Sequence, residues 1–271
     1  MSIRAVHHLN CATMCPVAGF LLGMRGWRGR MVAHCLLLET AQDGLVLVDT
    51  GFGTAEVRGE RKVPRMFGAL VSPAMDPGEP AIAQVEQLGY KPADVRHIVV
   101  THLDLDHAGG LSDFPDAQVH LHAREHAAAM SRATGKERER YQSAQWAHDP
   151  KWQVYEEQGD TWRGLPAIAT LRGIREDIGI VPMHGHTRGH SAVIAKSGDR
   201  WLVHAGDAYF ARASVTGGKA PFGLGMFERA MQMDGAARRA SVGALAQLRK
   251  SYEDVELFCA HDAAEYDSVT A

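Results

Sequence analysis

The alternation of apolar and polar residues along the chain predicts short buried strands separated by helices. The first clear strand signals are the apolar runs 34–39 (HCLLLE) and 45–51 (LVLVDTG), which flank an Asp-Gly turn, as in a β-hairpin. The second run is apolar on both faces, so it belongs inside a sheet that is covered on both sides. Two more strands are predicted at 97–102 and 117–122.

The second half of the chain repeats this pattern. Helices are predicted at 79–88, which begins near a proline and ends before Gly89, and from about 236 to 250. Further strands are predicted at 177–184, 191–196, 200–206 and 255–260.

Three segments lack a strand pattern. We expect 58–78 to form an irregular loop or lid, because prolines interrupt its apolar residues. The glycine-, proline- and methionine-rich segment 215–233 is also expected to be irregular. The polar, alanine-rich segment at about 123–163 predicts a helical insertion.

The chain has 271 residues, which a single layered domain can accommodate. No short internal repeat, low-complexity tract or linker divides it. Strands and helices follow one another in mixed order, which suits sheets covered by helices. We therefore expect one domain over 1–271, with the helical insertion at about 123–163.

Composition narrows the range of partners. The net charge of −3 provides no basic field for nucleic acid or anionic lipid. No apolar run approaches the ~20 residues that a membrane-spanning helix needs. The four cysteines form no CxxC pair, which favours reduced thiols. We expect a cytoplasmic protein that acts on a small molecule, with neither nucleic acid nor a membrane as partner.

Several predicted strands run into a side chain that can bind a metal. The chain has 15 histidines, and imidazole is the commonest ligand of transition metals. The carboxyl ends of strands are where α/β proteins assemble their sites. The residues at or just beyond these strand ends are Asp49, His102, His186, Asp207 and His261.

The densest cluster is 102–107, which reads HLDLDH. In an extended segment the two leucines point one way and His102, Asp104 and Asp106 point the other. Grouping these side chains would be costly unless a cation binds them. His107 follows directly. The alternative is a solvated turn, since Asp and His are frequent in turns.

THLDLDHAGG (101–110) resembles the HxHxDH metal motif of the metallo-β-lactamase-fold hydrolases. Four other segments resemble motifs of the same superfamily, and all five occur in the family's order. They are VDTG (48–51), GHTRGHS (185–191), HAGDAYF (204–210) and CAHD (259–262). The resemblance implies an α/β fold, an αββα four-layer sandwich with two mixed β-sheets packed face to face and helices on both outer faces.

The resemblance also implies two metal ions and assigns their ligands. One ion would be held by His102, Asp104 and His186, the other by Asp106, His107 and His261, with Asp207 bridging both. Asp49 would hold a ligand imidazole from behind. His184, His190 and His204 match no ligand position, and we expect supporting or structural roles for them.

One position departs from the family pattern. The second histidine of HxHxDH is Asp104 here, giving HxDxDH. A carboxylate can still bind a metal, but it makes the site more anionic and harder. Zinc remains the first expectation for the two divalent ions, with iron or manganese as alternatives. Flavodiiron proteins carry a related acidic replacement, together with a flavodoxin-like domain for which this chain has no room.

The function that the resemblance implies is metal-dependent hydrolysis. The layout resembles the N-acyl-homoserine lactonase branch, so we expect a lactone or another small carboxylic ester, attacked by a metal-bound hydroxide. Asp106 would also accept and return a proton. Tyr209 would contact the reacting carbonyl, or would be a buried tyrosine. Residues that could line an acyl pocket, or belong to the core, are Met66, Phe67, Phe210, Phe222, Met226 and Phe227.

Three alternatives stay open. They are thioester hydrolysis of the glyoxalase II type, a di-iron redox protein, and a non-catalytic binder of small molecules on the same fold. The apolar segment 64–75 and the methionine-rich segment 224–233 would also permit a homodimer.

Overall fold

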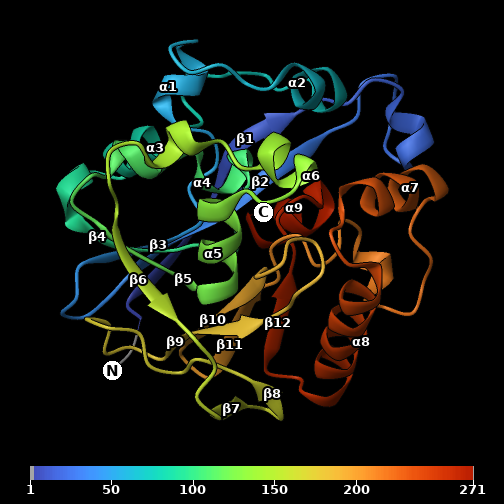
Figure 1. The fold of residues 1–271 in the computed structure, drawn as a ribbon. Coiled ribbons are helices and arrows are strands. Elements are labelled where there is room, and N and C mark those ends of the chain that lie inside the picture. Colours follow the sequence, from blue (N-terminus) through green and yellow to red (C-terminus); the bar gives the residue numbers. More distant parts are fainter. Residues whose placement is uncertain (1–2, 271) are drawn as a thin grey trace.

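The computed structural model describes residues 3–270, which form two β-sheets packed face to face between layers of helices (Figure 1). This confirms the predicted α/β sandwich. Among these residues, none of the helices has the length and apolarity needed to cross a bilayer.

The first sheet has six strands in the order β1-β2-β3-β4-β5-β6. The first three strands pair antiparallel, and β3 to β6 pair parallel. Their bounds are β1 Ala5–Met14, β2 Met31–Glu39, β3 Leu45–Val48, β4 Val95–Val99, β5 Gln118–His122 and β6 Lys151–Tyr155.

The second sheet has four strands in the order β12-β11-β10-β9. Strands β9, β10 and β11 pair antiparallel, whereas β11 and β12 are parallel. Their bounds are β9 Ile178–Pro182, β10 Ser191–Ser197, β11 Arg200–His204 and β12 Val255–Phe258, and the two-residue strands β7 Thr161–Trp162 and β8 Leu165–Pro166 form a separate ribbon.

Apolar side chains fill three successive layers. Leu36 and Val46 of the first sheet pack between the sheets with Ile180 and Val193 of the second. The alternate residues of β2 and β3 face outward, under the helices α3 and α5. The outer face of the second sheet packs against α8. Strands β2 and β3 are therefore buried on both faces, which confirms the prediction made for the run that contains β3.

The helices cover the outer faces and the edge where the strands end. Their bounds are α1 Thr54–Val57, α2 Arg65–Val71, α3 Ala81–Gln87, α4 Leu105–Ala108, α5 Ala123–Ser131, α6 Gly135–Arg140, α7 Phe222–Met231, α8 Gly235–Ser251 and α9 Ala263–Thr270. Five 3₁₀ turns join them, at Gly19–Leu22, Pro92–Asp94, Gly109–Asp113, Ser143–Trp146 and Arg212–Ser214.

The structure corrects the sequence predictions in several segments. Strand β1 has no counterpart among them, because His7, His8 and Asn10 interrupt its apolar pattern. Short helices α2 and α7 lie where irregular structure was expected. The predicted helical insertion is helical only in its first part, because β6 pairs in parallel with β5 and extends the first sheet.

The turn after β3 requires glycine. Gly51 has φ 63°, and a Cβ there would lie 2.2 Å from the Cβ of Cys11 on β1. The main chains are held close by a hydrogen bond from the Phe52 amide to the Cys11 carbonyl. This close approach fixes the segment that carries Asp49 against β1.

We expect Gly51→Ala to lower the free energy of unfolding more than Gly59→Ala does. Gly59 also has positive φ, at 73°, but a methyl group there would meet no atom within 4 Å, so this variant isolates the backbone cost. That cost is about 1–2 kcal/mol at either position. Overpacking against Cys11 should add about 1–3 kcal/mol at Gly51 alone. Urea unfolding followed by tryptophan fluorescence measures both, and equal losses would contradict the close approach.

Candidate metal centre

The predicted ligands meet at one edge of the two sheets. His102 follows β4, and the next residues lead into the short helix α4. His186, Asp207 and His261 follow β9, β11 and β12 of the second sheet. All are nearly or fully buried, at 0–8% exposure: His102, Asp104, Asp106, His107, His186, Asp207 and His261.

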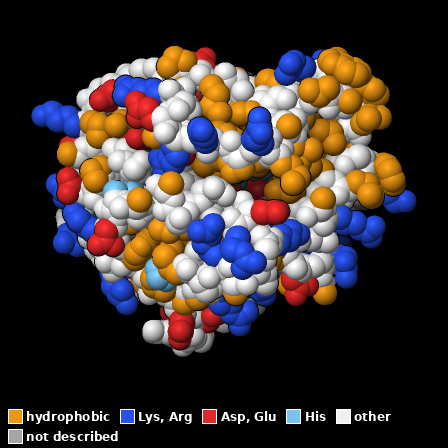
Figure 2. Space-filling model, turned by 45° about the horizontal axis from the view of Figure 1, so that its top comes forward, with side chains coloured by type: hydrophobic (Ala, Val, Ile, Leu, Met, Phe, Trp, Pro, Cys, Tyr) orange, Lys and Arg blue, Asp and Glu red, His pale blue; other side chains and the backbone are white. Residues whose placement is uncertain are grey.

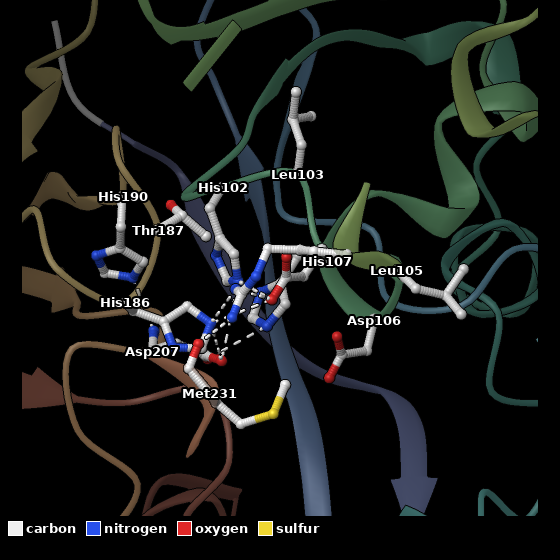
Figure 3. Close-up of polar contacts among 12 residues, drawn as sticks. His102, Leu103, Leu105, Asp106, His107, His186, Thr187, His190, Asp207 and Met231 are labelled. Atoms are coloured by element: carbon white, nitrogen blue, oxygen red, sulfur yellow. Dashed lines mark hydrogen bonds and ion pairs between the residues drawn. The ribbon is translucent and has the colours of Figure 1, made fainter. Parts of the chain in front are cut away.

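The first group of possible ligands is His102, His186 and Asp207, whose donor atoms all lie within 4.8 Å of one another. The Oδ2 atom of Asp207 is 3.3 Å from His186 Nε2 and 3.8 Å from His102 Nε2. Figure 3 shows these side chains pointing toward one another, while Leu103 and Leu105 point away. The prediction of an extended segment is wrong from Leu105 onward, where helix α4 begins.

The second group is Asp106, His107 and His261, which meets the same distance criterion. The other oxygen of Asp207, Oδ1, is 3.2 Å from His107 Nε2 and 3.1 Å from His261 Nε2. Asp106 Oδ2 lies 3.5 Å from His261 Nε2. Asp207 thus offers one oxygen to each group, which is the geometry of a bridging ligand.

The donor atoms fit divalent metal ions. Within residues 3–270, His102 Nε2 and Asp207 Oδ1 are buried without a hydrogen-bond partner. Leaving such atoms unsatisfied is costly, and a bound ion is one of the arrangements that satisfies them. Imidazole nitrogens and carboxylate oxygens are ligands that zinc, iron and manganese accept.

Asp49 and Thr101 fix the orientation of the His107 ring in the second group, on the side of the ring that faces away from the other ligand candidates. The Oδ2 atom of Asp49 lies 2.8 Å from His107 Nδ1, so the Nε2 atom of that ring is the one that faces the centre. Thr101 donates to Asp49 through its amide and its hydroxyl, each at 2.7 Å. Burial would raise the pKa of Asp49, but the His107 imidazole outweighs it and the pKa is lowered.

Backbone contacts fix two further imidazoles. His261 donates from Nδ1 to the Val32 carbonyl at 2.7 Å, which turns its Nε2 atom toward Asp207. His190 donates from Nδ1 to the Met183 carbonyl and accepts the Asp207 amide at Nε2, both at 2.8 Å. Both nitrogens of His190 are occupied, so it positions Asp207 and cannot itself bind a metal.

The carboxylates around the second group favour cations. Burial opposes protonation of His107, but Asp207 and Asp49 raise its pKa well above the ordinary value. The pKa of His261 is also raised, because Asp207 outweighs the effect of burial. Protons and metal ions therefore compete for these nitrogens.

Asp104 lies beside the first group and is paired with a cation. Its Oδ2 atom is 2.6 Å from Arg140 Nη1, 3.1 Å from His186 Nε2 and 3.4 Å from His102 Nε2. Burial would raise the pKa of Asp104, but Arg140 and the two neighbouring histidines, His102 and His186, together outweigh it and hold that pKa well below its usual range. Arg140 does not stand out in the sequence, because it is the last residue of GKERER, a segment with the composition of a solvated helix.

Tyr209 is directed elsewhere. Its side chain is fully buried, and its hydroxyl donates to the carboxylate of Glu265 on α9, at 3.2 and 3.3 Å. This contradicts the prediction that the hydroxyl contacts a reacting carbonyl. The alternative of a buried tyrosine describes its position.

Two cavities adjoin the ligands. One of about 540 Å³ has Met66, Phe67 and Met231 in its wall and reaches Asp104 and Arg140. The other, of about 20 Å³, lies directly over the ligands and is lined in part by Phe67, Phe210 and Phe227. Figure 3 shows Met231 next to this cluster.

Two predicted pocket residues lie outside these walls. Phe222 and Met226 on α7 are 85% and 51% exposed and line neither cavity. Hydrophobic side chains gather on this face of the molecule (Figure 2). Met66 on α2 is also largely exposed, at 75%. A contact between two copies through these segments stays a prediction.

A third group, His122, Glu157 and His184, also has donor atoms within 4.8 Å of one another. The Nδ1 atom of His122 accepts the Arg124 amide at the start of α5. In the neutral ring the proton then sits on Nε2, 3.2 Å from Glu157. This tautomer suits an interaction with the carboxylate better than metal binding.

Two known proteins are similar to this chain in sequence. A probable metallo-hydrolase of Mycobacterium tuberculosis is 40% identical over 263 residues, which are 96% of this chain and 81% of that protein. An N-acyl homoserine lactonase of Bacillus cereus is 33% identical over 122 residues, 45% of either chain.

Solved structures share the fold. An N-acyl homoserine lactone hydrolase with the product N-hexanoyl-L-homoserine bound at its catalytic metal centre has a TM-score of 0.73 at 19% identity, covering 99% of this chain and 97% of the other. A probable metal-dependent hydrolase from Staphylococcus aureus has a TM-score of 0.69 at 18% identity, covering 97% and 91%. The sequence itself matches the metallo-beta-lactamase superfamily over residues 28–261, a stretch that contains every ligand candidate, and the chain belongs to that superfamily.

Proposed function

We propose that the protein is a metal-dependent hydrolase that opens a lactone or another small carboxylic ester with two divalent metal ions. The observation that carries this proposal is the pair of ligand groups joined by Asp207 beneath an apolar cavity. The 40% identity to a probable metallo-hydrolase over 96% of the chain supports the reaction class.

Two divalent ions in such a site lower the pKa of a water molecule and polarise a carbonyl oxygen. The protein's own part is to hold the donor atoms in place. Asp207 reaches both groups with its two oxygens, and His190 fixes its main chain. We assign to Asp106, which lines the small cavity above the ligands, the transfer of the proton during ester cleavage in addition to ligation.

The cavity beside the centre suits an acyl chain. Met66, Phe67, Leu70 and Met231 contribute flexible or aromatic apolar surface next to the ligands. The similar lactone hydrolase structure holds a hexanoyl product at its metal centre. An acylated lactone is therefore the substrate class that we favour for this chain.

A di-iron redox protein is the second candidate. Asp104 favours it, because an added carboxylate near the first group makes the site harder. Zinc remains our first choice, since the other donors are largely imidazoles. Thioester hydrolysis and simple binding of a small molecule are distinguished from lactone hydrolysis by the substrate panel described below.

Glu125 on α5 holds the two ligand-bearing loops together. Its Oε1 atom accepts the Leu103 amide at 2.9 Å and the Tyr141 hydroxyl at 3.1 Å. Its Oε2 atom accepts the Thr187 hydroxyl at 2.6 Å and the Gly189 amide at 3.1 Å. The four donors match an ionised carboxylate, which only accepts hydrogen bonds.

A substrate panel tests the proposed reaction. The metal-loaded protein should hydrolyse acyl homoserine lactones faster than aryl esters or thioesters, as followed by the release of acid. Chelation should abolish hydrolysis, and added zinc or manganese should restore it. His102→Ala and His107→Ala should lose both metal loading and hydrolysis.

Two results would contradict this proposal. Lactone hydrolysis by the metal-free protein would show that the metals are not needed. No hydrolysis across the panel, with metal content confirmed by elemental analysis, would favour the binder or, with a visible iron spectrum, the redox protein.

Glu125→Gln should loosen the centre. The NH2 group of the glutamine would face two of the four donors and could not accept their hydrogen bonds. This should lower the free energy of unfolding by about 2–3 kcal/mol. Metal retention during dialysis should fall as well, because the loops of Leu103 and Thr187 lose their common partner. Glu139→Gln on the exposed side of α6 is the matched control, and equal behaviour of the two variants would rule out this role.

Tyr209→Phe should leave hydrolysis unchanged, because the hydroxyl is bonded to Glu265 and not directed at the centre. Unfolding free energy should fall by about 1 kcal/mol for the lost hydrogen bond. A fall in rate of about 100-fold or more at normal metal content is the effect expected of a lost carbonyl contact, and would reverse our assignment.

A further inference from the structure

A cationic side chain lies inside the metal centre. The Nη1 atom of Arg140 is 2.6 Å from Asp104 Oδ2 and 3.0 Å from His186 Nε2. The Arg140 side chain is 5% exposed, so water contributes little to its solvation. Arg140 therefore contacts one ligand atom of the first group, His186 Nε2, and the carboxylate of Asp104 beside it.

The nitrogen shared by Arg140 and the first metal position has a single lone pair. His186 Nε2 can accept the Arg140 N–H or bind a metal ion, but it cannot do both. A metal on that nitrogen would also lie close to a guanidinium of the same sign of charge. In the second group, the ion pairs among residues 3–270 involve only histidines and aspartates. The two positions are therefore unequal.

Arg140 is rigidly mounted. It ends helix α6, which begins with a capping box between Thr134 and Glu137. The next residue, Tyr141, is fully buried and donates to Glu125. The second guanidinium nitrogen, Nη2, donates to the Met231 carbonyl. These contacts make the position of Arg140 a property of the fold.

The charges of Asp104 and Arg140 balance each other. Relative to a neutral histidine, Asp104 adds one negative charge to the first group, and Arg140 adds one positive charge. A buried carboxylate without a partner would be costly, so the arginine accounts for how the replacement is tolerated. Asp104 Oδ1 is buried and has no hydrogen-bond partner in residues 3–270, which leaves it available as a ligand.

We propose that Arg140 competes with the metal for the first position, so that the two positions bind metal with unequal affinity. The Asp106–His107–His261 group fills at low free metal. The His102–His186–Asp207 group fills only at higher free metal, when Arg140 releases His186 and keeps its contacts with Asp104 Oδ2 and the Met231 carbonyl. Metal availability would then switch the centre between one ion and two. This inference rests on the proposed metal centre but not on the proposed substrate.

The wild-type protein provides the first test. Crystals of metal-stripped protein reloaded with one equivalent of zinc should give an anomalous scattering peak at the Asp106–His107–His261 group. The peak at the His102–His186 group should be much weaker and should grow with excess zinc. Equal peaks at one equivalent, or a stronger peak at the first group, would overturn the proposal.

Arg140→Met provides the second test, with bound zinc counted at buffered free-metal concentrations. Removing the guanidinium frees His186, so the second equivalent should bind at free zinc about 10–100-fold lower than in wild type. Arg138→Met, an exposed arginine on the same helix, is the control and should bind as wild type does. Circular dichroism checks that both variants fold.

The direction in which Arg140→Met changes the affinity for the second zinc equivalent decides between the two roles of the arginine. Unchanged or weaker binding of the second equivalent in folded Arg140→Met would mean that the arginine holds Asp104 in place for the metal. Wild-type protein that binds no zinc would instead defeat the proposed function. An inactive protein that shows the expected zinc steps would leave this inference standing.

Discussion

The burial of many ionisable groups at one sheet edge is the constraint on which the rest of this structure depends. Asp207 and the four candidate ligand histidines lie at 0–4% exposure with their donor atoms facing one another. In the absence of cations, such a cluster would combine desolvation with repulsion between carboxylates. Bound metal ions would offset that cost, and folding and metal affinity would then be coupled. Asp207 is central because its two oxygens reach both groups.

Positioning of the ligands relies on buried groups that never reach the metals. Asp49 fixes the His107 ring, the Val32 carbonyl fixes His261, and His190 fixes the main chain of Asp207. Glu125 joins the loop after β4 to the loop after β9. These contacts come from both sheets. The sandwich therefore acts as the frame of the centre, and its two halves cannot shift without moving a ligand.

Much of this could be predicted from the sequence, for identifiable reasons. Strands β2 and β3 are continuous apolar runs, and the HLDLDH segment places its polar residues at a regular spacing, so local pattern was enough. The remaining features depend on long-range contacts. Segment β1 forms a strand despite its polar residues, because it pairs with β2. Segment β6 forms a strand because it pairs with β5. Tyr209 lies two residues after Asp207 in sequence, yet its hydroxyl donates to Glu265 on α9 and is not directed at the centre.

Arg140 and Asp104 illustrate the same limit most clearly. Considered alone, Asp104 is a loss of a histidine ligand, and Arg140 is one charge in a polar helix. Together they form a buried pair of no net charge, 36 residues apart in sequence, at the position where the family motif has a neutral ring. Because a guanidinium also donates to His186, the pair does more than preserve charge. It places a permanent cation against one of the two proposed metal positions, so the two positions would differ in their affinity for a metal ion.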